Sequence, residues 1–171
     1  GQGDLAVGAI FNIGSWIGGD RGGNPFVTAE ITRHAVQTHS MVAMDFYLDE
    51  VRALTEQFSL SAFLVSVSPA LAAMSAASPE SSPYREHEPY RRALAGIYAR
   101  LDATSRLLDD HPALVAPAGS GEPYASAADF AAELDVVIES LKRHGGQRLA
   151  RGRLRDLRRA VEVFGFHLCP L

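Results

Sequence analysis

The sequence predicts a mainly α fold in which the helices are flanked by one short strand near each end of the chain. Apolar residues recur at helical spacing between Thr28 and Phe164, helix-capping residues precede these stretches, and β-forming residues gather near both ends. A hydrophobic share of 47% with a net charge of −4 excludes a disordered chain of 171 residues. The single cysteine, Cys169, excludes an intramolecular disulfide and a multi-cysteine zinc site, and it favours a reducing compartment.

The first predicted element is a strand over residues 5–17, which are apolar and rich in β-forming residues. A loop with four glycines follows over residues 18–25, so that the strand and loop together occupy residues 5–27. A glycine-rich loop between a strand and a helix N-terminus is a usual place for an anion, and Arg21 offers a planar fork of donors. The alternative is a structural turn in which Asp20 and Arg21 pair with each other.

Residues 28–164 predict a helical region. Thr28 and Ser68 are N-caps, Pro89 stands at a first helical position, and Ser126 with Asp129 has the spacing of a capping box. The helices are expected over residues 28–58, 68–77, 89–110, 126–145 and 152–163. On the first helix, the spacing predicts an apolar stripe of Ile31, Ala35, Val42, Phe46, Val51, Leu54 and Phe58. The stripes of the later helices are Tyr90, Leu94, Ile97, Leu101 and Leu108; Phe130, Leu134, Val137 and Leu141; and Leu154, Leu157, Val161 and Phe164.

The last predicted element is a strand over residues 166–171, after Gly165 stops the final helix. With one strand at each end, we expect the two to be neighbours in a sheet whose other strands lie outside this chain. The chain begins without methionine and stops inside an apolar run, so we expect it to be a piece of a longer protein. The sequence contains no apolar run of about 18 residues, which is the length that would predict a membrane-spanning helix.

Two groups of arginines are further candidate sites. Arg91 and Arg92 follow Pro89 at a predicted helix start, where they and the helix dipole would attract an anion; the alternative is an ordinary helix start with an exposed arginine. Arg148, Arg151, Arg155 and Arg158 or Arg159 recur at three- and four-residue spacing. This stripe, Arg148–Arg159, fits either nucleic-acid phosphates or a solvated helix face. The pI of about 5.8 and the lack of interleaved aromatic residues favour the second reading.

Residues 14–28 read Gly-Ser-Trp-Ile-Gly-Gly-Asp-Arg-Gly-Gly-Asn-Pro-Phe-Val-Thr. This stretch resembles the signature Gly-Ser-Trp-Met/Ile-Gly-Gly-Asp-Arg-Asp-Gly-Asn-Pro-x-Val-Thr of the bacterial type of phosphoenolpyruvate carboxylase. Two further segments also resemble family segments: Glu88-Pro89-Tyr90-Arg91, and Leu154 through Leu171, a helix with Leu-Arg-Arg followed by Val163-Phe164-Gly165-Phe166-His167-Leu168. The resemblance covers residues 13–171. The chain departs from the signature at Gly22, where the family has aspartate.

The resemblance implies that the chain is an internal piece of this enzyme and that its two strands belong to an incomplete β barrel of the parent. The parent reaction forms oxaloacetate and phosphate from phosphoenolpyruvate and bicarbonate with Mg²⁺ or Mn²⁺. Bicarbonate attacks phosphorus, which gives carboxyphosphate and an enolate, and the enolate then takes CO₂. Arg21 is the implied catalytic residue, and the implied substrate-binding residues are Gly18, Gly19, Asp20, Arg21, Gly23 and Asn24.

The resemblance also implies what this stretch lacks. The family's catalytic histidine, in Thr-Ala-His-Pro-Thr, would lie before residue 1, and its Asp-x-Arg-Gln motif would begin directly after Leu171. The metal-binding Glu and Asp would lie further on, so we expect no metal ligand and no activity in this piece alone. For the parent we expect a cytoplasmic, allosteric homotetramer that supplies the tricarboxylic acid cycle, with neither nucleic acid nor membrane as a partner. We expect Arg91 and Arg92 to be a candidate anion or effector site.

Overall fold

The computed structural model describes residues 28–59 and 65–167. Within these ranges the chain is helical and contains no strand. The helices are α1 Ala29–Gln57, α2 Pro69–Ala76, α3 Pro89–Asp109, α4 Ala127–Arg143, α5 Gln147–Arg151 and α6 Arg153–Phe164, with a short 3₁₀ turn η1 at Pro83–Arg85. No helix in the described part of the chain is long and apolar enough to cross a membrane.

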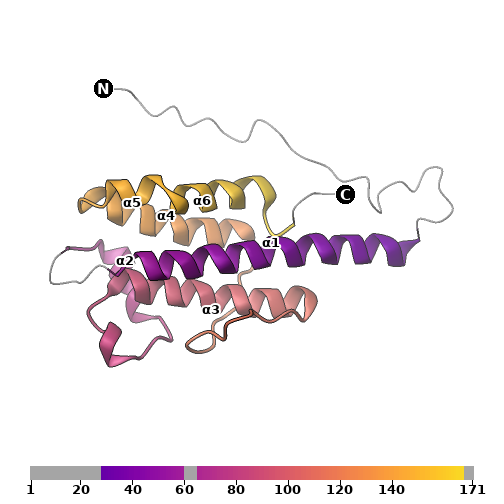
Figure 1. Ribbon diagram of the computed structural model, residues 1–171, viewed down its shortest axis with the longest axis horizontal. Helices are drawn as coiled ribbons and strands as arrows, with labels where there is room; N and C mark the ends of the chain where they lie inside the picture. Colours follow the sequence, from indigo (N-terminus) through magenta and orange to yellow (C-terminus); the bar gives the residue numbers. More distant parts are fainter. Residues whose placement is uncertain (1–27, 60–64, 168–171) are drawn as a thin grey trace, which may run out of the picture.

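The long helix α1 runs through the middle of the molecule (Figure 1). Helix α3 packs along one side of α1 and carries α2, whereas α6 packs on another side and lies against α4 and α5. Two contacts of Tyr47 join α1 to the helices α4 and α6. Its ring lies 5.6 Å from the ring of Phe130 on α4, and its hydroxyl donates a 2.6 Å hydrogen bond to the carbonyl of Gly165, directly after α6.

The helices begin where the capping residues predicted. The hydroxyl oxygens of Thr28, Ser68 and Ser126 accept hydrogen bonds from the backbone N–H three residues ahead, over 3.3, 3.2 and 3.3 Å. These bonds satisfy amides that have no partner within the helix, which typically stabilises a helix by about 1 kcal/mol. Helix α3 ends at Asp110, whose φ of 51° lies in the left-handed region.

Most of the predicted stripe residues form the core. Among the fully buried side chains are Val51, Leu54 and Phe58 of α1 and its C-cap, Leu94, Ile97 and Leu101 of α3, Phe130, Leu134 and Val137 of α4, and Leu154 and Leu157 of α6. Each such side chain contributes roughly 1.5–3 kcal/mol relative to an exposed one. This confirms the helical periods that the sequence predicted.

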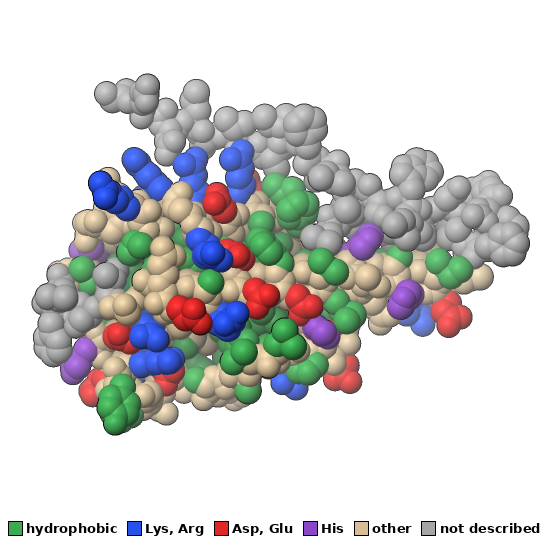
Figure 2. Space-filling model, in the orientation of Figure 1, with side chains coloured by type: hydrophobic (Ala, Val, Ile, Leu, Met, Phe, Trp, Pro, Cys, Tyr) green, Lys and Arg blue, Asp and Glu red, His purple; other side chains and the backbone are tan. Residues whose placement is uncertain are grey.

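Of the stripe predicted between Ile31 and Phe46, Ala35 is buried and the other three residues are wrong. Ile31, Val42 and Phe46 are 45%, 48% and 45% exposed, and Ala43, Met44 and Tyr47 are buried in their place. Apolar residues stand on both faces there, and α1 extends past the end of α3, so spacing alone did not identify the packed face (Figure 1). Leu108 is also wrong: it is 39% exposed in the last turn of α3. Figure 2 shows hydrophobic side chains on the surface along α1.

Two other elements differ from prediction. Residues 147–151 form a separate helix, α5, which the sequence analysis had assigned to no helix. Gly152, whose backbone angles (φ −90°, ψ −135°) are not helical, divides it from α6. Of the strand predicted over residues 166–171, the described Phe166 and His167 lie in a turn, because Gly165 with a φ of 58° redirects the chain. The rest of that strand, and the strand predicted over residues 5–17, fall outside the described residues.

Candidate functional site

A cavity of about 360 Å³ lies between α1, the start of α3, the loop that carries η1 and the loop that follows α3. Arg52, Arg85 and Arg91 project into its wall from three different elements, and we call this space the arginine cavity. Two acidic residues, Glu56 and Glu80, also line it. Each of the three guanidiniums also pairs with a carboxylate: Arg52 with Glu56, Arg85 with Glu80 and Arg91 with Glu88.

Arg91 is the predicted site residue that reaches the cavity. Its Nη1 atom lies 3.1 Å from a carboxylate oxygen of Glu88, the N-cap residue of α3. Its Nε atom is buried and has no hydrogen-bond partner. A buried donor without a partner normally costs about 1–3 kcal/mol, so Arg91 retains an unused donor beside the cavity.

Arg92 does not join Arg91 there. It is half-buried, it does not line the arginine cavity, and its Nε atom also lacks a hydrogen-bond partner. Neighbouring residues on a helix point about 100° apart, so one helix start does not direct both guanidiniums to the same place.

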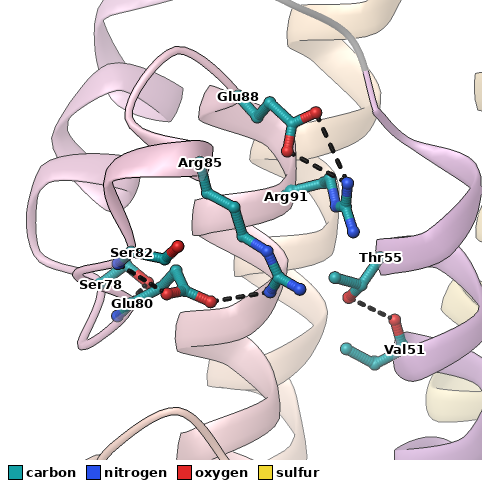
Figure 3. Close-up of polar contacts among 8 residues, drawn as sticks. All are labelled: Val51, Thr55, Ser78, Glu80, Ser82, Arg85, Glu88 and Arg91. Atoms are coloured by element: carbon teal, nitrogen blue, oxygen red, sulfur yellow. Dashed lines mark hydrogen bonds and ion pairs between the residues drawn. The ribbon is translucent and has the colours of Figure 1, made fainter.

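Arg85 is held in the cavity wall by Glu80. The Glu80 side chain is nearly buried and accepts from Arg85 Nη1 over 2.7 Å and from the backbone N–H of Ser82 over 2.9 Å. Figure 3 shows the guanidiniums of Arg85 and Arg91 both extending toward Thr55 on α1. The Thr55 hydroxyl donates to the carbonyl of Val51, so its oxygen can still accept from a ligand.

Tyr98 of α3 joins the cavity to the loop after that helix. Its hydroxyl donates a 2.8 Å hydrogen bond to the carbonyl of Val115, which lines the cavity with Ala116 and Pro117. Burial raises the pKa of Tyr98 above its usual value, and the nearby Asp102 carboxylate raises it further. Tyr98 therefore stays neutral and remains a donor at physiological pH.

The loop over residues 111–125 is fastened to α3 at several points. A buried carboxylate oxygen of Asp102 accepts from the N–H of Ala113 over 2.7 Å, and Thr104 accepts from the N–H of Tyr124 over 2.8 Å. Arg100 donates to the carbonyl of Glu122 over 3.0 Å. These bonds make the outer wall of the cavity a fixed surface.

Glu133 of α4 completes this fastening. It pairs with Arg100 and accepts a 2.5 Å hydrogen bond from the hydroxyl of Tyr124, while the guanidinium of Arg100 lies 4.0 Å above the Tyr124 ring. Burial raises the pKa of Tyr124, and the negative charge of Glu133 raises it further. The three side chains connect α3, the loop and α4.

The second predicted arginine group lies on α5 and α6, and none of its members lines the arginine cavity. Arg148, Arg151, Arg155 and Arg159 are exposed, whereas Arg158 pairs with Asp135 over 2.9 Å and with Glu162 over 3.3 Å. These contacts agree with a solvated, partly paired face, and nothing in the described residues favours nucleic acid.

The other predicted site residues, Gly18, Gly19, Asp20, Arg21, Gly23 and Asn24, lie outside the described residues. Within the described ranges, no group of three or more His, Cys, Asp or Glu side chains is arranged to hold a metal ion. The described side chains therefore do not fit the Mg²⁺ or Mn²⁺ that the resemblance implies.

Sequence reasoning missed Arg52, Glu80 and Arg85. The segment around Arg85 reads as a connecting loop, and Arg52 lies on a helix with no motif around it. An arginine two residues after a proline in a serine-rich loop is a weak signal, because many such arginines are simply solvated. Only folding brings these residues beside Arg91.

The described residues define a helical module with an arginine-lined cavity between its helices. The family model described as phosphoenolpyruvate carboxylase matches residues 2–171. A phosphoenolpyruvate carboxylase of Azoarcus sp. (strain BH72) is 54% identical over 163 residues, which cover 95% of this chain and 18% of that protein. Those of Nitrosomonas europaea and Ralstonia nicotianae are 49% and 50% identical and cover 96% and 95% of this chain.

The chain belongs to the phosphoenolpyruvate carboxylase family. It spans about a fifth of the length of the curated relatives it matches. The alternative of a nucleic-acid-binding module gains no support from these relatives.

Proposed function

We propose that the full-length protein containing this chain forms oxaloacetate and phosphate from phosphoenolpyruvate and bicarbonate. The match to phosphoenolpyruvate carboxylases across 95% of the chain supports this proposal. We further propose that it uses Mg²⁺ or Mn²⁺ held outside these 171 residues, and that it is a cytoplasmic, allosteric homotetramer that supplies the tricarboxylic acid cycle. The 171-residue chain alone is inactive under this proposal, because the catalytic histidine and the metal ligands lie elsewhere.

Within this chain, Arg21 is the proposed catalytic residue. Gly18, Gly19, Asp20, Gly23 and Asn24 are proposed to shape the loop that binds substrate. The enolate and the transferring phosphoryl group both carry negative charge, which a fixed guanidinium stabilises. Removing one such charge-assisted bond costs ~2–4 kcal/mol in the transition state.

The experiment measures oxaloacetate through malate dehydrogenase and NADH in the full-length enzyme. Arg21→Ala is expected to lower kcat/KM by roughly 30- to 1,000-fold with little change in Tm, and Arg21→Lys to restore only part of it. A lowered Tm with near-normal kcat/KM would mean that Arg21 only pins the loop. Metal-dependent turnover by the 171-residue chain alone would refute its proposed inactivity.

We also propose the arginine cavity as a site for a small anion that acts as an effector. The unused buried Nε donor of Arg91 and the three guanidiniums in the cavity wall support this, because an anion accepts hydrogen bonds from such donors. The sequence pointed to Arg91 and Arg92 together; the proposal rests on Arg91, because Arg92 does not line the cavity.

Inorganic sulfate is the probe, and thermal stabilisation of the full-length protein is the measurement. A ligand at 100 times its Kd stabilises the folded state by about 2.7 kcal/mol. Arg91→Ala is expected to abolish the sulfate-dependent rise in Tm, whereas Arg92→Ala is the matched control and should retain it. Equal responses in the two variants would exclude Arg91 as the anion ligand.

A further inference from the structure

The outer side of α5 and α6 is strongly basic. Residues 147–164 contain six arginines and two acidic residues, a net charge of +4 in a chain whose total is −4. The remaining residues therefore carry −8 together. Figure 1 places α5 and α6 end to end along one edge of the bundle, and Figure 2 shows a row of basic side chains along that edge.

This side of α5 and α6 faces away from the core. Leu154, Leu157 and Val161 are buried on the opposite side of α6, and Ala150 is buried on α5. Arg148, Arg151 and Arg159 are exposed, and no hydrogen bond or ion pair to another described residue joins any of them. We call these three arginines the basic face.

The neighbouring arginines show the contrast. Arg153 reaches Glu50 of α1 over 2.8 Å, and Arg158 reaches Asp135 of α4 over 2.9 Å. The arginines that border α1 and α4 thus pair with carboxylates of those helices, whereas the basic face has no carboxylate partner among the described residues. Arg148 and Arg151 are like charges three residues apart on α5, a spacing that destabilises a helix by about 0.2–0.5 kcal/mol per pair.

We propose that the basic face docks on an acidic surface in the part of the same polypeptide that lies outside these 171 residues. This inference rests on the proposed function, since it requires the full-length carboxylase. The matched segment is about a fifth of the relatives' length, so most of the surface available to cover α5 and α6 belongs to the rest of the chain. Arginine forks pair with carboxylates through two parallel hydrogen bonds, which suits this occupant.

Charge and composition disfavour nucleic acid as the occupant. The rest of the chain carries −8 and would repel a polyanion, and residues 147–163 contain no aromatic side chain on which a base could stack. A carboxylate surface on a folded domain presents only a few fixed charges, so this repulsion is smaller for it than for a polyanion.

Zero-length crosslinking of the full-length enzyme tests the contact. Arg151→Lys and Arg159→Lys each add an amine, and a carbodiimide then joins that amine to any carboxylate it touches. Lys142 is the one native lysine among these 171 residues, so a crosslink from position 151 or 159 is readily told from the other peptides of this segment by mass spectrometry. Arg52→Lys is the matched control, because Arg52 lies 3.4 Å from Glu56 and a crosslink there proves that the reagent reacts.

The expected result is a crosslink from position 151 or 159 to an Asp or Glu outside residues 1–171 of the same polypeptide. Three outcomes would overturn the inference. They are a crosslink within residues 1–171, a crosslink between subunits in a mixture of ¹⁵N-labelled and unlabelled enzyme, and the absence of any crosslink while the Arg52→Lys control reacts. Salt-dependent capture of labelled DNA that Arg151→Glu abolishes would overturn it as well.

A second measurement does not depend on crosslinking. The double variant Arg151→Glu with Arg159→Glu is expected to lower the Tm of the full-length enzyme by several degrees at low salt, and less in 1 M NaCl. An unchanged Tm at low salt counts against the contact. Oxaloacetate formation by the unsubstituted enzyme is measured separately, so loss of this inference leaves the proposed function standing.

Discussion

Replacing Glu133 with glutamine is expected to loosen the loop that forms the outer wall of the arginine cavity. The Glu133 carboxylate receives Arg100 from α3 and the hydroxyl of Tyr124 from the loop. Glutamine keeps the shape of the side chain and removes its charge. The substitution therefore weakens both contacts without opening a cavity in the core.

The size of the effect follows from these two contacts. A hydrogen bond to a charged group contributes about 1.5–3 kcal/mol and a neutral one about 0.5–1.5 kcal/mol, so each contact loses about 1 kcal/mol. The Glu133 and Arg100 side chains are 24% and 31% exposed, and water screens part of their attraction. We expect a total loss of about 2 kcal/mol, or roughly 4–8 °C in Tm for a chain of this size.

Urea denaturation of the 171-residue chain, followed by circular dichroism, measures this loss. Tyr124→Phe removes one contact alone and is expected to cost about 1–2 kcal/mol. Because both changes affect the same bond, the double variant should lose less than the sum of the single losses. Additive losses, or a Glu133→Gln loss below about 0.5 kcal/mol, would refute the coupling of the loop to α4.

Three further outcomes are expected. Circular dichroism of the chain should report far more helix than sheet. Gly121→Ala should cost about 2 kcal/mol, because its Cβ would stand 2.8 Å from the backbone nitrogen of Arg100, whereas the control Gly152→Ala, with no atom nearer than 4.0 Å, should change stability much less. Burial raises the pKa of Tyr47 and Tyr124 in the folded state. The stability that this contributes is present below about pH 10 and should be lost as pH rises above it, so the urea midpoint should fall. Tyr124→Phe should make this fall of the urea midpoint smaller.

The helices could be predicted because their signals are local. Thr28, Ser68, Pro89 and Ser126 stand where helices begin, and the packed stripes of α3, α4 and α6 repeat every three or four residues. Each of these signals lies within one turn of the residue it concerns. Boundaries within two or three residues of the structure followed from them.

Burial and the cavity could not be predicted in the same way. Whether Val42 or Ala43 faces the core depends on where α3 and α6 lie, and that information is distributed over the chain. Arg52, Arg85 and Arg91 meet only because α1, η1 and α3 fold together. Of the predicted site residues, Arg91 reaches the cavity, Arg92 does not, and Arg21 remains a prediction.

The uninterrupted length of α1 has a mechanical consequence. The 29 residues from Ala29 to Gln57 contain neither glycine nor proline, and at 1.5 Å per residue they form a rod about 44 Å long. One end of this rod follows Arg21 by only a few residues of sequence, and the other carries Arg52, Thr55 and Glu56 of the cavity. A helix of this kind tilts as one body. A small displacement imposed at one end of α1 therefore also displaces the residues at its other end.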